Sequence, residues 1–444
     1  MLNNSPWIEQ LEDINYDQLE KTVDAEVCVV GAGISGCLSA YYILENTQKS
    51  VILLDAWKVG QSASGHNAGQ VINQFERSAK SIEKEFGTKK VIEARQVIED
   101  SWTRLLEILD KIDLTPQPRI FKGYDAYNSV EQLNNILDDL VVYNKLGQRN
   151  FEKLYILKDI HIDHKYAGLY QRIELKKLKD YLDTQRDDFV GALERKTLIM
   201  NSALVCQKLI QFLLQVYPKR FRVFEKTEVI RIDLGLQNSF LKCNKGLVNC
   251  NKIVLCTNGF ENFQINNKNG EDIIKSFHQN IIGKVGLMQG YFSFDYKEEI
   301  YSAVSYSPRK GNLKEYEEYI YTTKRRFGEG FLLTVGGTEM NLKEGYKYNR
   351  DVDYKADKYK NLEKFIITEY ANLPKKVIKK YHWHGLMGYT KNMIRIVGVE
   401  PRNKNLLYNL GCNGVGLLPS VFGGWKISQI IGGKKVEKDI FDSV

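Results

Sequence analysis

The sequence predicts a two-domain α/β fold, in which a discontinuous Rossmann-type domain is combined with a second domain that has an antiparallel sheet and helices. The chain has 444 residues and 43% apolar content, which exceeds what one ordinary domain needs. A strand, a glycine turn, a helix and a second strand follow one another near its start. Residues 285–340 consist of Tyr-, Phe-, Thr- and Val-rich runs separated by glycine turns, a pattern typical of antiparallel strands.

The first of these units is a β-α-β unit, with strands expected at 26–30 and 51–54 and a helix expected at 34–44. Amphipathic segments predict further helices at 81–112, 130–146 and 199–216. A third apolar strand at 253–256 and a glycine-opened helix at 415–431 resemble the first unit in pattern. We therefore expect the nucleotide domain to comprise 1–78, 195–265 and 380–444, and the second, substrate domain to comprise 79–194 and 266–379.

A dinucleotide fingerprint lies within the first unit. Gly31, Gly33 and Gly36 form G-x-G-x-x-G between strand and helix, and Asp55 ends the second strand nineteen residues beyond Gly36. The glycines permit a tight turn, close approach of a pyrophosphate to backbone N–H groups, and close packing of helix on strand. The helix N-terminus attracts the phosphates, and the terminal acid accepts hydrogen bonds from a ribose diol. The motif predicts a bound dinucleotide and does not choose between NAD and FAD.

Composition limits the class of protein further. The chain has 63 Lys plus Arg against 55 Asp plus Glu, a net charge of +8, and these charges are interspersed, so no nucleic-acid partner is expected. Its seven cysteines form no C-x-x-C pair, which favours a reducing compartment. Residues 1–21 lack the apolar stretch of a secretory signal, and the apolar run 27–44 is broken by glycines, so no membrane span is expected. These features predict a soluble, cytoplasmic protein.

Several short segments, in order along nearly the whole chain, resemble one known family. They are Ser-Pro-Trp at 5–7, Gly-Gln-Ser-Ala-Ser-Gly-His-Asn-Ala-Gly-Gln at 60–70, Cys-Thr-Asn-Gly-Phe at 256–260, Trp-His-Gly at 383–385, the run 390–398, and Gly-Cys-Asn-Gly-Val-Gly at 411–416. The chain resembles the D-amino-acid oxidase superfamily of FAD-dependent oxidoreductases, and most resembles its γ-glutamylputrescine oxidase and glycine oxidase-like branch. The resemblance implies FAD as the cofactor.

The fingerprint and the resemblance together imply a set of FAD-binding residues spread over the chain. They are Gly31, Gly33, Ile34, Ser35, Gly36, Asp55, Ala56, Ser62, Ser64, Gly65, His66, Asn67, Gly69, Gln70, Val229, Thr257, Asn258, Gly259, Gly385, Gly414, Val415 and Gly416. The last three open an apolar helix, whose N–H groups are expected to face the pyrimidine edge of the flavin; the same glycines also permit close helix packing.

The chain departs from the family pattern near the expected flavin. Asn392 and Arg395 stand where the family commonly has Asp and Pro, and His66 stands where it often has Arg. The spacing of His66 and Gly69 is similar to that of relatives with a histidine-linked flavin, so a covalent bond at His66 and a neutral, hydrogen-bonded histidine are both open. Gly385 occupies the position at which another branch attaches its flavin through cysteine, so cysteinyl attachment is not expected.

The substrate-pocket candidates come from the expected sheet and from the C-terminal segment. Carboxylate-binding relatives place an Arg and often a Tyr above the flavin, which makes Tyr321, Arg325 and Arg326 candidates together with the neighbouring Tyr319. A guanidinium would hold a carboxylate with two hydrogen bonds, whereas a Lys-Arg-Arg run at a hairpin is also typical of a solvated turn.

Two further candidates lie closer to the C-terminus. His384 is one of two histidines that flank Trp383, and Arg395 is a candidate for binding substrate or stabilising an anionic flavin. No further ligands complete a metal site around the histidines, so no metal is expected.

The resemblance implies oxidation of the C–N bond of an amine or amino acid by hydride transfer to FAD, with oxygen as the expected acceptor. One alternative is a dehydrogenase of a hydroxy acid or amine that passes electrons to a quinone or carrier protein. Another is a flavoprotein binding module with altered chemistry, suggested by Asn392 and Arg395. An RNA-directed flavin enzyme is disfavoured, because the chain carries no RNA-binding motif.

Overall fold

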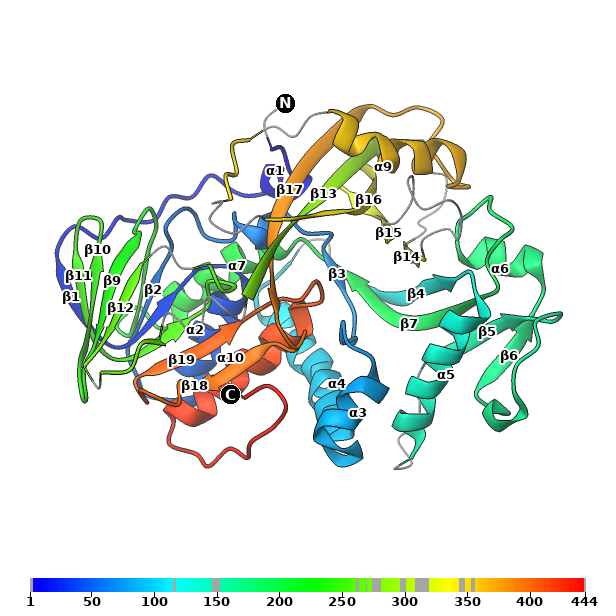
Figure 1. Cartoon of the computed structure of the whole chain (residues 1–444). Helices are drawn as coiled ribbons and strands as arrows, with labels where there is room; N and C mark the ends of the chain where they lie inside the picture. Colours follow the sequence, from blue (N-terminus) through cyan, green and yellow to red (C-terminus); the bar gives the residue numbers. More distant parts are fainter. Residues whose placement is uncertain are drawn as a thin grey trace.

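The computed structural model describes residues 3–114, 117–145, 152–260, 263–268, 270–273, 281–295, 301–307, 319–342, 348–352 and 356–442. Within these residues the strands form two sheets, which lie on opposite sides of the molecule in Figure 1. This arrangement confirms the predicted fold class, a Rossmann-type domain combined with a second, mainly antiparallel sheet and its helices.

The first sheet has nine described strands, in the order β12-β9-β10-β11-β1-β2-β8, with β19 on β11 and β18 on β19. The strands are β1 (Thr22–Val30), β2 (Val51–Leu54), β8 (Phe221–Phe224), β9 (Val229–Leu234), β10 (Ser239–Cys243), β11 (Leu247–Leu255), β12 (Gln264–Asn267), β18 (Ile396–Val399) and β19 (Leu406–Leu410). Its central strands β8, β2, β1, β11 and β19 are parallel. Parallel neighbours bring the carboxyl ends of β1, β2 and β11 to one edge, where dinucleotides bind in this class of fold.

Helices cover this sheet and build its core. They are α2 (Ile34–Asn46), α7 (Ser202–Val216), α10 (Leu417–Ile431) and α4 (Thr88–Lys111), and they share one apolar cluster with the sheet. The predicted helix at 81–112 is two helices, α3 (Ala79–Phe86) and α4, because Gly87 between them adopts φ +83°. Among the described helices, none has both the length and the apolar character needed to cross a bilayer.

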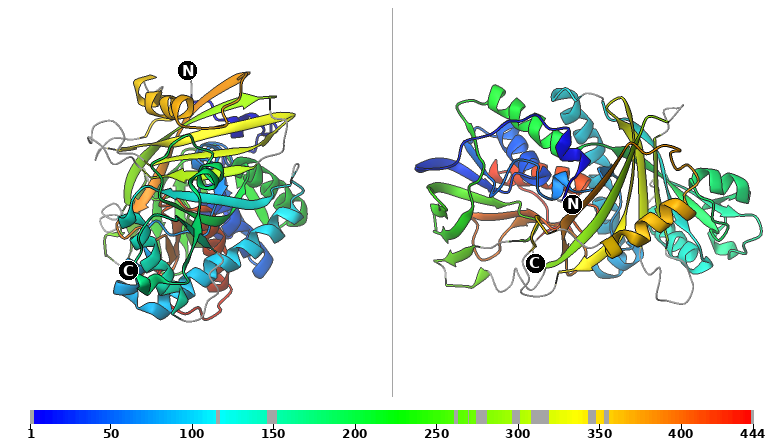
Figure 2. Two further views of the ribbon diagram at one scale, coloured as in Figure 1. Left: turned by 90° about the vertical axis from the view of Figure 1, so that its right-hand side faces the viewer. Right: turned by 90° about the horizontal axis from the view of Figure 1, so that it is seen from above.

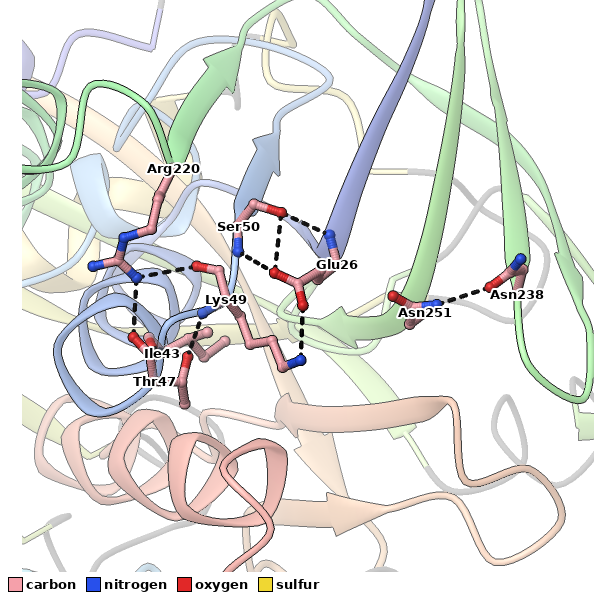
Figure 3. A network of polar contacts seen from close by, with 8 residues as sticks. All are labelled: Glu26, Ile43, Thr47, Lys49, Ser50, Arg220, Asn238 and Asn251. Carbon is pink, nitrogen blue, oxygen red and sulfur yellow. Dashed lines mark hydrogen bonds and ion pairs between the residues drawn. The ribbon is translucent and has the colours of Figure 1, made fainter.

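The far end of the β-α-β unit is fixed by polar contacts (Figure 3). Glu26 on β1 accepts hydrogen bonds from Lys49 Nζ (2.7 Å) and from the backbone N–H of Ser50 (2.9 Å). At the C-terminus of α2, Arg220 donates to the carbonyl oxygen of Thr47 (2.9 Å), as Figure 3 shows. It also donates to the carbonyl oxygen of Leu44 (3.2 Å). A cation at this end satisfies free carbonyl groups and complements the helix dipole. These contacts anchor α2 and leave its N-terminus at the glycine turn.

The second sheet has ten described strands, in the order β17-β13-β16-β15-β14-β4-β7-β5-β6, with β3 paired to β7. They are β3 (Gln70–Val71), β4 (Ile120–Tyr127), β5 (Lys153–Leu157), β6 (Tyr170–Ile173), β7 (Gly191–Ile199), β13 (Ile281–Ser293), β14 (Ser302–Tyr306), β15 (Ile320–Phe327), β16 (Gly330–Asn341) and β17 (Lys379–Thr390). The helices α5 (Val130–Asn144), α6 (Leu175–Tyr181) and α9 (Ala356–Thr368) belong to this half, and the short α1 (Pro6–Glu9) lies near β17 (Figure 2).

Two of the predicted domain boundaries fall at strands of this second sheet, and the boundary at 265/266 falls inside β12 of the first sheet. The boundary at 194/195 lies inside β7, and the boundary at 379/380 lies at the start of β17, which pairs along its whole length with β13. We propose a division by sheet membership, in which β7 and β17 belong to the substrate domain and the dinucleotide domain resumes after residue 390.

Candidate functional site

A cavity of about 460 Å³ lies between the two sheets. Its walls come from the glycine turn, the segment 61–76, the ends of β2 and β11, the strands β13, β15, β16 and β17, and the loop before α10. A volume of several hundred Å³ is typical of small-molecule and cofactor sites. Nineteen of the predicted FAD-binding residues line this cavity: Gly31, Gly33, Ile34, Ser35, Asp55, Ala56, Ser62, Ser64, His66, Asn67, Gly69, Gln70, Val229, Thr257, Asn258, Gly385, Gly414, Val415 and Gly416.

The remaining three predicted residues support the cavity wall from behind. A Cβ atom on Gly36 would lie 1.8 Å from the carbonyl oxygen of Gly31, and one on Gly65 would lie 2.4 Å from Cδ1 of Ile8. Gly259 adopts φ +95°, which side chains rarely tolerate. These glycines are needed for close packing and backbone conformation, so they shape the site without facing the cavity.

The glycine turn fits a dinucleotide. Gly31 adopts φ +100°, and a Cβ atom there would lie 2.8 Å from the carbonyl oxygen of Cys256 at the end of β11. Ser64 Oγ accepts a hydrogen bond from the backbone N–H of Ile34 (2.9 Å), which joins the segment 60–70 to the start of α2. The first N–H groups of a helix have no partner within it, so this turn presents donors and a positive dipole end toward the cavity.

Asp55 completes the dinucleotide end. Its Oδ2 atom accepts from the N–H of Ala32 and its Oδ1 atom from the N–H of Trp57, both at 2.7 Å. Burial raises the pKa of Asp55, opposed by these two hydrogen bonds. Each carboxylate oxygen has two lone pairs, so the group can fix the turn and still accept a hydrogen bond from a ribose hydroxyl group in the cavity.

Two arginines add positive charge at this end. Arg395 lines the cavity and donates from Nε to Asn409 Oδ1 (2.8 Å) and from Nη2 to the hydroxyl group of Ser35 in the first turn of α2. Burial lowers the pKa of Arg395 to about 10, so the guanidinium stays charged at neutral pH. Arg350, which the sequence analysis missed, lines the same end and donates to Ser62 Oγ (3.2 Å). Guanidinium groups beside a helix N-terminus suit a pyrophosphate.

His66 lies between the dinucleotide end and the second sheet. Its Nδ1 atom is 2.9 Å from the carbonyl oxygen of Ser62, and because a carbonyl only accepts, Nδ1 carries the proton and Nε2 does not. Burial lowers the pKa of His66 to about 4, so the ring is neutral at physiological pH. A Cβ atom on Gly385 would lie 2.9 Å from the backbone oxygen of His66, so only a glycine on β17 permits this approach.

The loop before α10 closes the middle of the cavity. Gly414 adopts φ +75°, and the preceding Asn413 accepts a hydrogen bond from the backbone N–H of Thr390 (2.8 Å). Asn258, after β11, accepts from the N–H of Cys412 (2.8 Å), so the loop is held from both sheets. Asn392 accepts from the N–H of Ile394 (3.1 Å) in the turn after β17 and is not among the described cavity-lining residues.

The substrate candidates separate into two groups. Tyr319 and Tyr321 line the cavity, whereas Arg325 and Arg326 are not among its described lining residues. Alternation along β15 places Arg325 on the same face as Tyr321, about 13 Å further along the strand. There its guanidinium lies 5.0 Å from the ring of Trp7. Among the described lining residues there is therefore no arginine from this hairpin.

The other two substrate candidates, His384 and Arg395, lie in different parts of the site. His384 is buried and is held by the Tyr348 hydroxyl group (3.0 Å to Nδ1) and the Val352 carbonyl oxygen (2.9 Å to Nε2). Tyr348 is one of the lining residues, so His384 contacts the cavity wall through it. Arg395 lies at the dinucleotide end, as described above.

Two acids that were not predicted from the sequence also line the cavity. Glu339 on β16 lies 2.9 Å from Lys284 Nζ on β13 and accepts a hydrogen bond from the hydroxyl group of Tyr389 on β17 (3.1 Å). Glu76, in the segment between β3 and α3, also lines the cavity. Burial and the negative charge of Glu339 raise the pKa of Glu76 to about 7. No motif marks either residue; the register of β13, β16 and β17 places Glu339 beside Lys284 and Tyr389, and the segment after β3 brings Glu76 to the same cavity.

The two sheets and the cavity between them define the class of the protein as a dinucleotide-binding oxidoreductase. The model of the FAD-dependent oxidoreductase family DAO matches residues 26–430, and the chain belongs to this family. FAD is therefore its cofactor, and the chain is an FAD-dependent oxidoreductase, as the resemblance implied.

Individual relatives are similar over shorter stretches. The chain is 32% identical to a probable oxidoreductase of Haemophilus influenzae over 190 residues, covering 41% of this chain and 37% of that protein. It is 39% identical over 72 residues to the γ-glutamylputrescine oxidoreductase of Escherichia coli, covering 16% of this chain and 17% of that protein. The matched stretches thus span well under two thirds of these relatives.

Solved structures are similar in fold over nearly the whole chain. The crystal structure of glycine oxidase from Geobacillus kaustophilus superposes with a TM-score of 0.68 at 15% identity, covering 94% of this chain and 98% of that one. At this identity the likeness concerns the fold, and it agrees with the two-sheet architecture described above.

Proposed function

We propose that this chain oxidises the C–N bond of an amine or amino acid, with molecular oxygen as the electron acceptor. The observation that carries the proposal is the continuity of one cavity from the glycine turn, past His66 and Gly385, to the tyrosine- and glutamate-lined face of the second sheet. Bound FAD supplies the chemistry, because its flavin accepts a hydride from the carbon beside the nitrogen and the resulting imine hydrolyses in water.

The residues of the first sheet hold the cofactor in this proposal. The backbone N–H groups at the start of α2, together with Arg395 and Arg350, bind the pyrophosphate, and Asp55 accepts from the ribose. The N-terminus of α10, opened by Gly414 and Gly416, would present its positive dipole end to the flavin. A positive end there stabilises the negative charge of the reduced cofactor.

The second sheet positions the substrate and limits access of water. Met288, Tyr321 and Leu386 present side chains to the cavity, and Gly336 makes room for two of them. A Cβ atom on Gly336 would lie 2.1 Å from Met288 Sδ and 2.4 Å from Tyr321 Cζ. A wall of this kind aligns the reacting C–H bond with the flavin, which is the main contribution that a protein makes to this reaction.

We further propose that Nε2 of His66 is the atom through which any covalent bond to the flavin forms, since Nδ1 is engaged with Ser62. Acid precipitation of the purified protein tests this. Colour that stays with the precipitate and maps to His66 supports the proposal, and a flavin attached to any other residue contradicts it. Release of free FAD leaves His66 with a hydrogen-bonding role alone.

Anaerobic titration of the FAD-loaded protein with a panel of amines and amino acids tests the proposed reaction. Bleaching of the flavin by a panel member, followed by rapid recovery and hydrogen peroxide when air is admitted, supports an oxidase. Bleaching without recovery in air favours the dehydrogenase that hands electrons to a quinone or carrier. A flavin that no panel member bleaches favours the binding module.

A further inference from the structure

The described residues at the substrate end of the cavity include acidic groups and no arginine. Among the described lining residues, the arginines are Arg350 and Arg395, and both lie at the dinucleotide end. The described lining residues at the other end include Glu76, Glu339, Tyr319, Tyr321 and Tyr389. A substrate carboxylate would meet like charge there, and like charges at close range are strongly unfavourable in a partly desolvated site.

The two glutamates differ in their hydrogen-bond and ion-pair partners. Glu339 pairs with Lys284 at 2.9 Å and accepts from Tyr389. Glu76 lines the cavity, and no ion pair or hydrogen bond of its side chain is found among the described residues. The side chain of Glu76 is accessible from the cavity, so a bound cation can reach it and form a charge-assisted hydrogen bond.

The position of Glu76 is next to the expected flavin. A Cβ atom built on Gly414 would lie 3.7 Å from Glu76 Oε2 and 2.9 Å from Tyr389 Oη. The carboxylate, the tyrosine hydroxyl group and the loop that opens α10 therefore meet at one point of the cavity. A group bound by Glu76 lies beside the loop that faces the cofactor.

We propose that Glu76, assisted by Glu339, binds the ammonium group of the substrate, and that the substrate is an aliphatic amine or diamine without an α-carboxylate. This inference rests on the proposed function and narrows its substrate class. Glu76 accepts charge-assisted hydrogen bonds from the ammonium group, and Glu339 adds negative potential nearby. Tyr321 and Met288 enclose the aliphatic chain.

Matched pairs of ligands provide the test, because an amino acid and its decarboxylated amine differ by one carboxylate. The pairs are 1,5-diaminopentane with lysine and 1-aminopentane with norleucine. Binding is measured by calorimetry on the FAD-loaded protein at pH 8, with the flavin reduced beforehand under anaerobic conditions so that no ligand is consumed. The expected result is that each amine binds about ten-fold or more tightly than its amino acid.

Variants test whether the glutamates cause the tighter binding of the amines. Glu76→Gln and Glu339→Gln are each expected to weaken amine binding about ten-fold, and Glu76→Asp to restore part of it. Glu93→Gln is the control, since Glu93 lies on the surface of α4 with its side chain 43% exposed. Equal or tighter binding of the amino acids, or amine binding unchanged in Glu76→Gln, would overturn the inference.

The two proposals fail in different ways. If the oxidised flavin is bleached by an amino acid but the amines bind no better, the proposed oxidation stands and the cation site is wrong. If the amines bind through Glu76 but neither they nor the amino acids bleach the flavin, the cation site stands and the proposed oxidation is wrong.

Discussion

The hydroxyl group of Tyr389 lies 3.1 Å from Oε1 of Glu339, and Nζ of Lys284 lies 4.2 Å from the centre of the Tyr389 ring. A tyrosine of β17 therefore orients an acid of β16, and a lysine of β13, the strand between them, contacts both. We predict that Tyr389→Phe raises KM for an amine several-fold with a smaller change in kcat, because it removes a charge-assisted hydrogen bond, worth about 1.5–3 kcal/mol, that holds Glu339. Steady-state kinetics with a thermal melt as control measures this, and an unchanged KM would show that the orientation of Glu339 has no role.

The pKa of Glu76 predicts a pH dependence of binding. That pKa is raised to about 7, so Glu76 is neutral below pH 7 and charged above it, and amine binding strengthens as pH rises through 7. Glu339, Lys284 and Asp125 are the charged groups around it. The ammonium group of an alkylamine has a pKa of about 10 and stays charged over this range.

Calorimetry from pH 6 to pH 8 measures the effect. The wild type should bind amines more tightly at the higher pH, and Glu76→Gln should bind them with little pH dependence. A dependence that persists in the variant would assign the titration to another group.

The position of Arg395 predicts that its substitution weakens the binding of the cofactor rather than the binding of the substrate. It contacts the hydroxyl group of Ser35 in the first turn of α2, next to the expected phosphates. Arg395→Met should raise the Kd for FAD about ten-fold or more, because a charge-assisted contact to phosphate is lost. Arg231→Met, on an exposed side chain of β9 that pairs with Asp233, is the matched control. Equal FAD affinity in the two variants contradicts the assignment of Arg395.

The hydrogen bonds of Asp55 predict that its substitution lowers both the affinity for FAD and the stability of the protein. Its carboxylate accepts from the N–H groups of Ala32 and Trp57, so Asp55→Ala leaves two donors of the turn unsatisfied. The cost is about 1–3 kcal/mol in the free energy of unfolding of the FAD-free protein. Chemical denaturation measures it, with Asp55→Asn expected to lose less. Full stability of Asp55→Ala would show that the turn does not depend on this carboxylate.

The sequence predicted the fold and the dinucleotide end because local patterns carry them. Gly31, Gly33 and Gly36 impose a backbone path, and Asp55 follows at a fixed spacing. The substrate end was predicted less well. Arg325 has the right residue type but lies against Trp7, because its place along β15, rather than its strand face, takes it away from the cavity.

Glu76 and Glu339 lie 263 positions apart in the sequence, and the tertiary fold brings both to one cavity. No local pattern encodes that proximity. Likewise, the hydrogen bond between Arg395 and Ser35 joins residues 360 positions apart. The sequence placed Arg395 near the flavin, whereas the contact with α2 assigns it to the phosphate end.

The most direct test of the account is a stopped-flow measurement of flavin absorbance after the FAD-loaded protein is mixed anaerobically with 1,5-diaminopentane. The account predicts bleaching at a rate that saturates with amine concentration, with a higher half-saturating concentration in Glu76→Gln and recovery with hydrogen peroxide when air is admitted. A flavin spectrum in the wild type that remains unchanged at every amine concentration would contradict it.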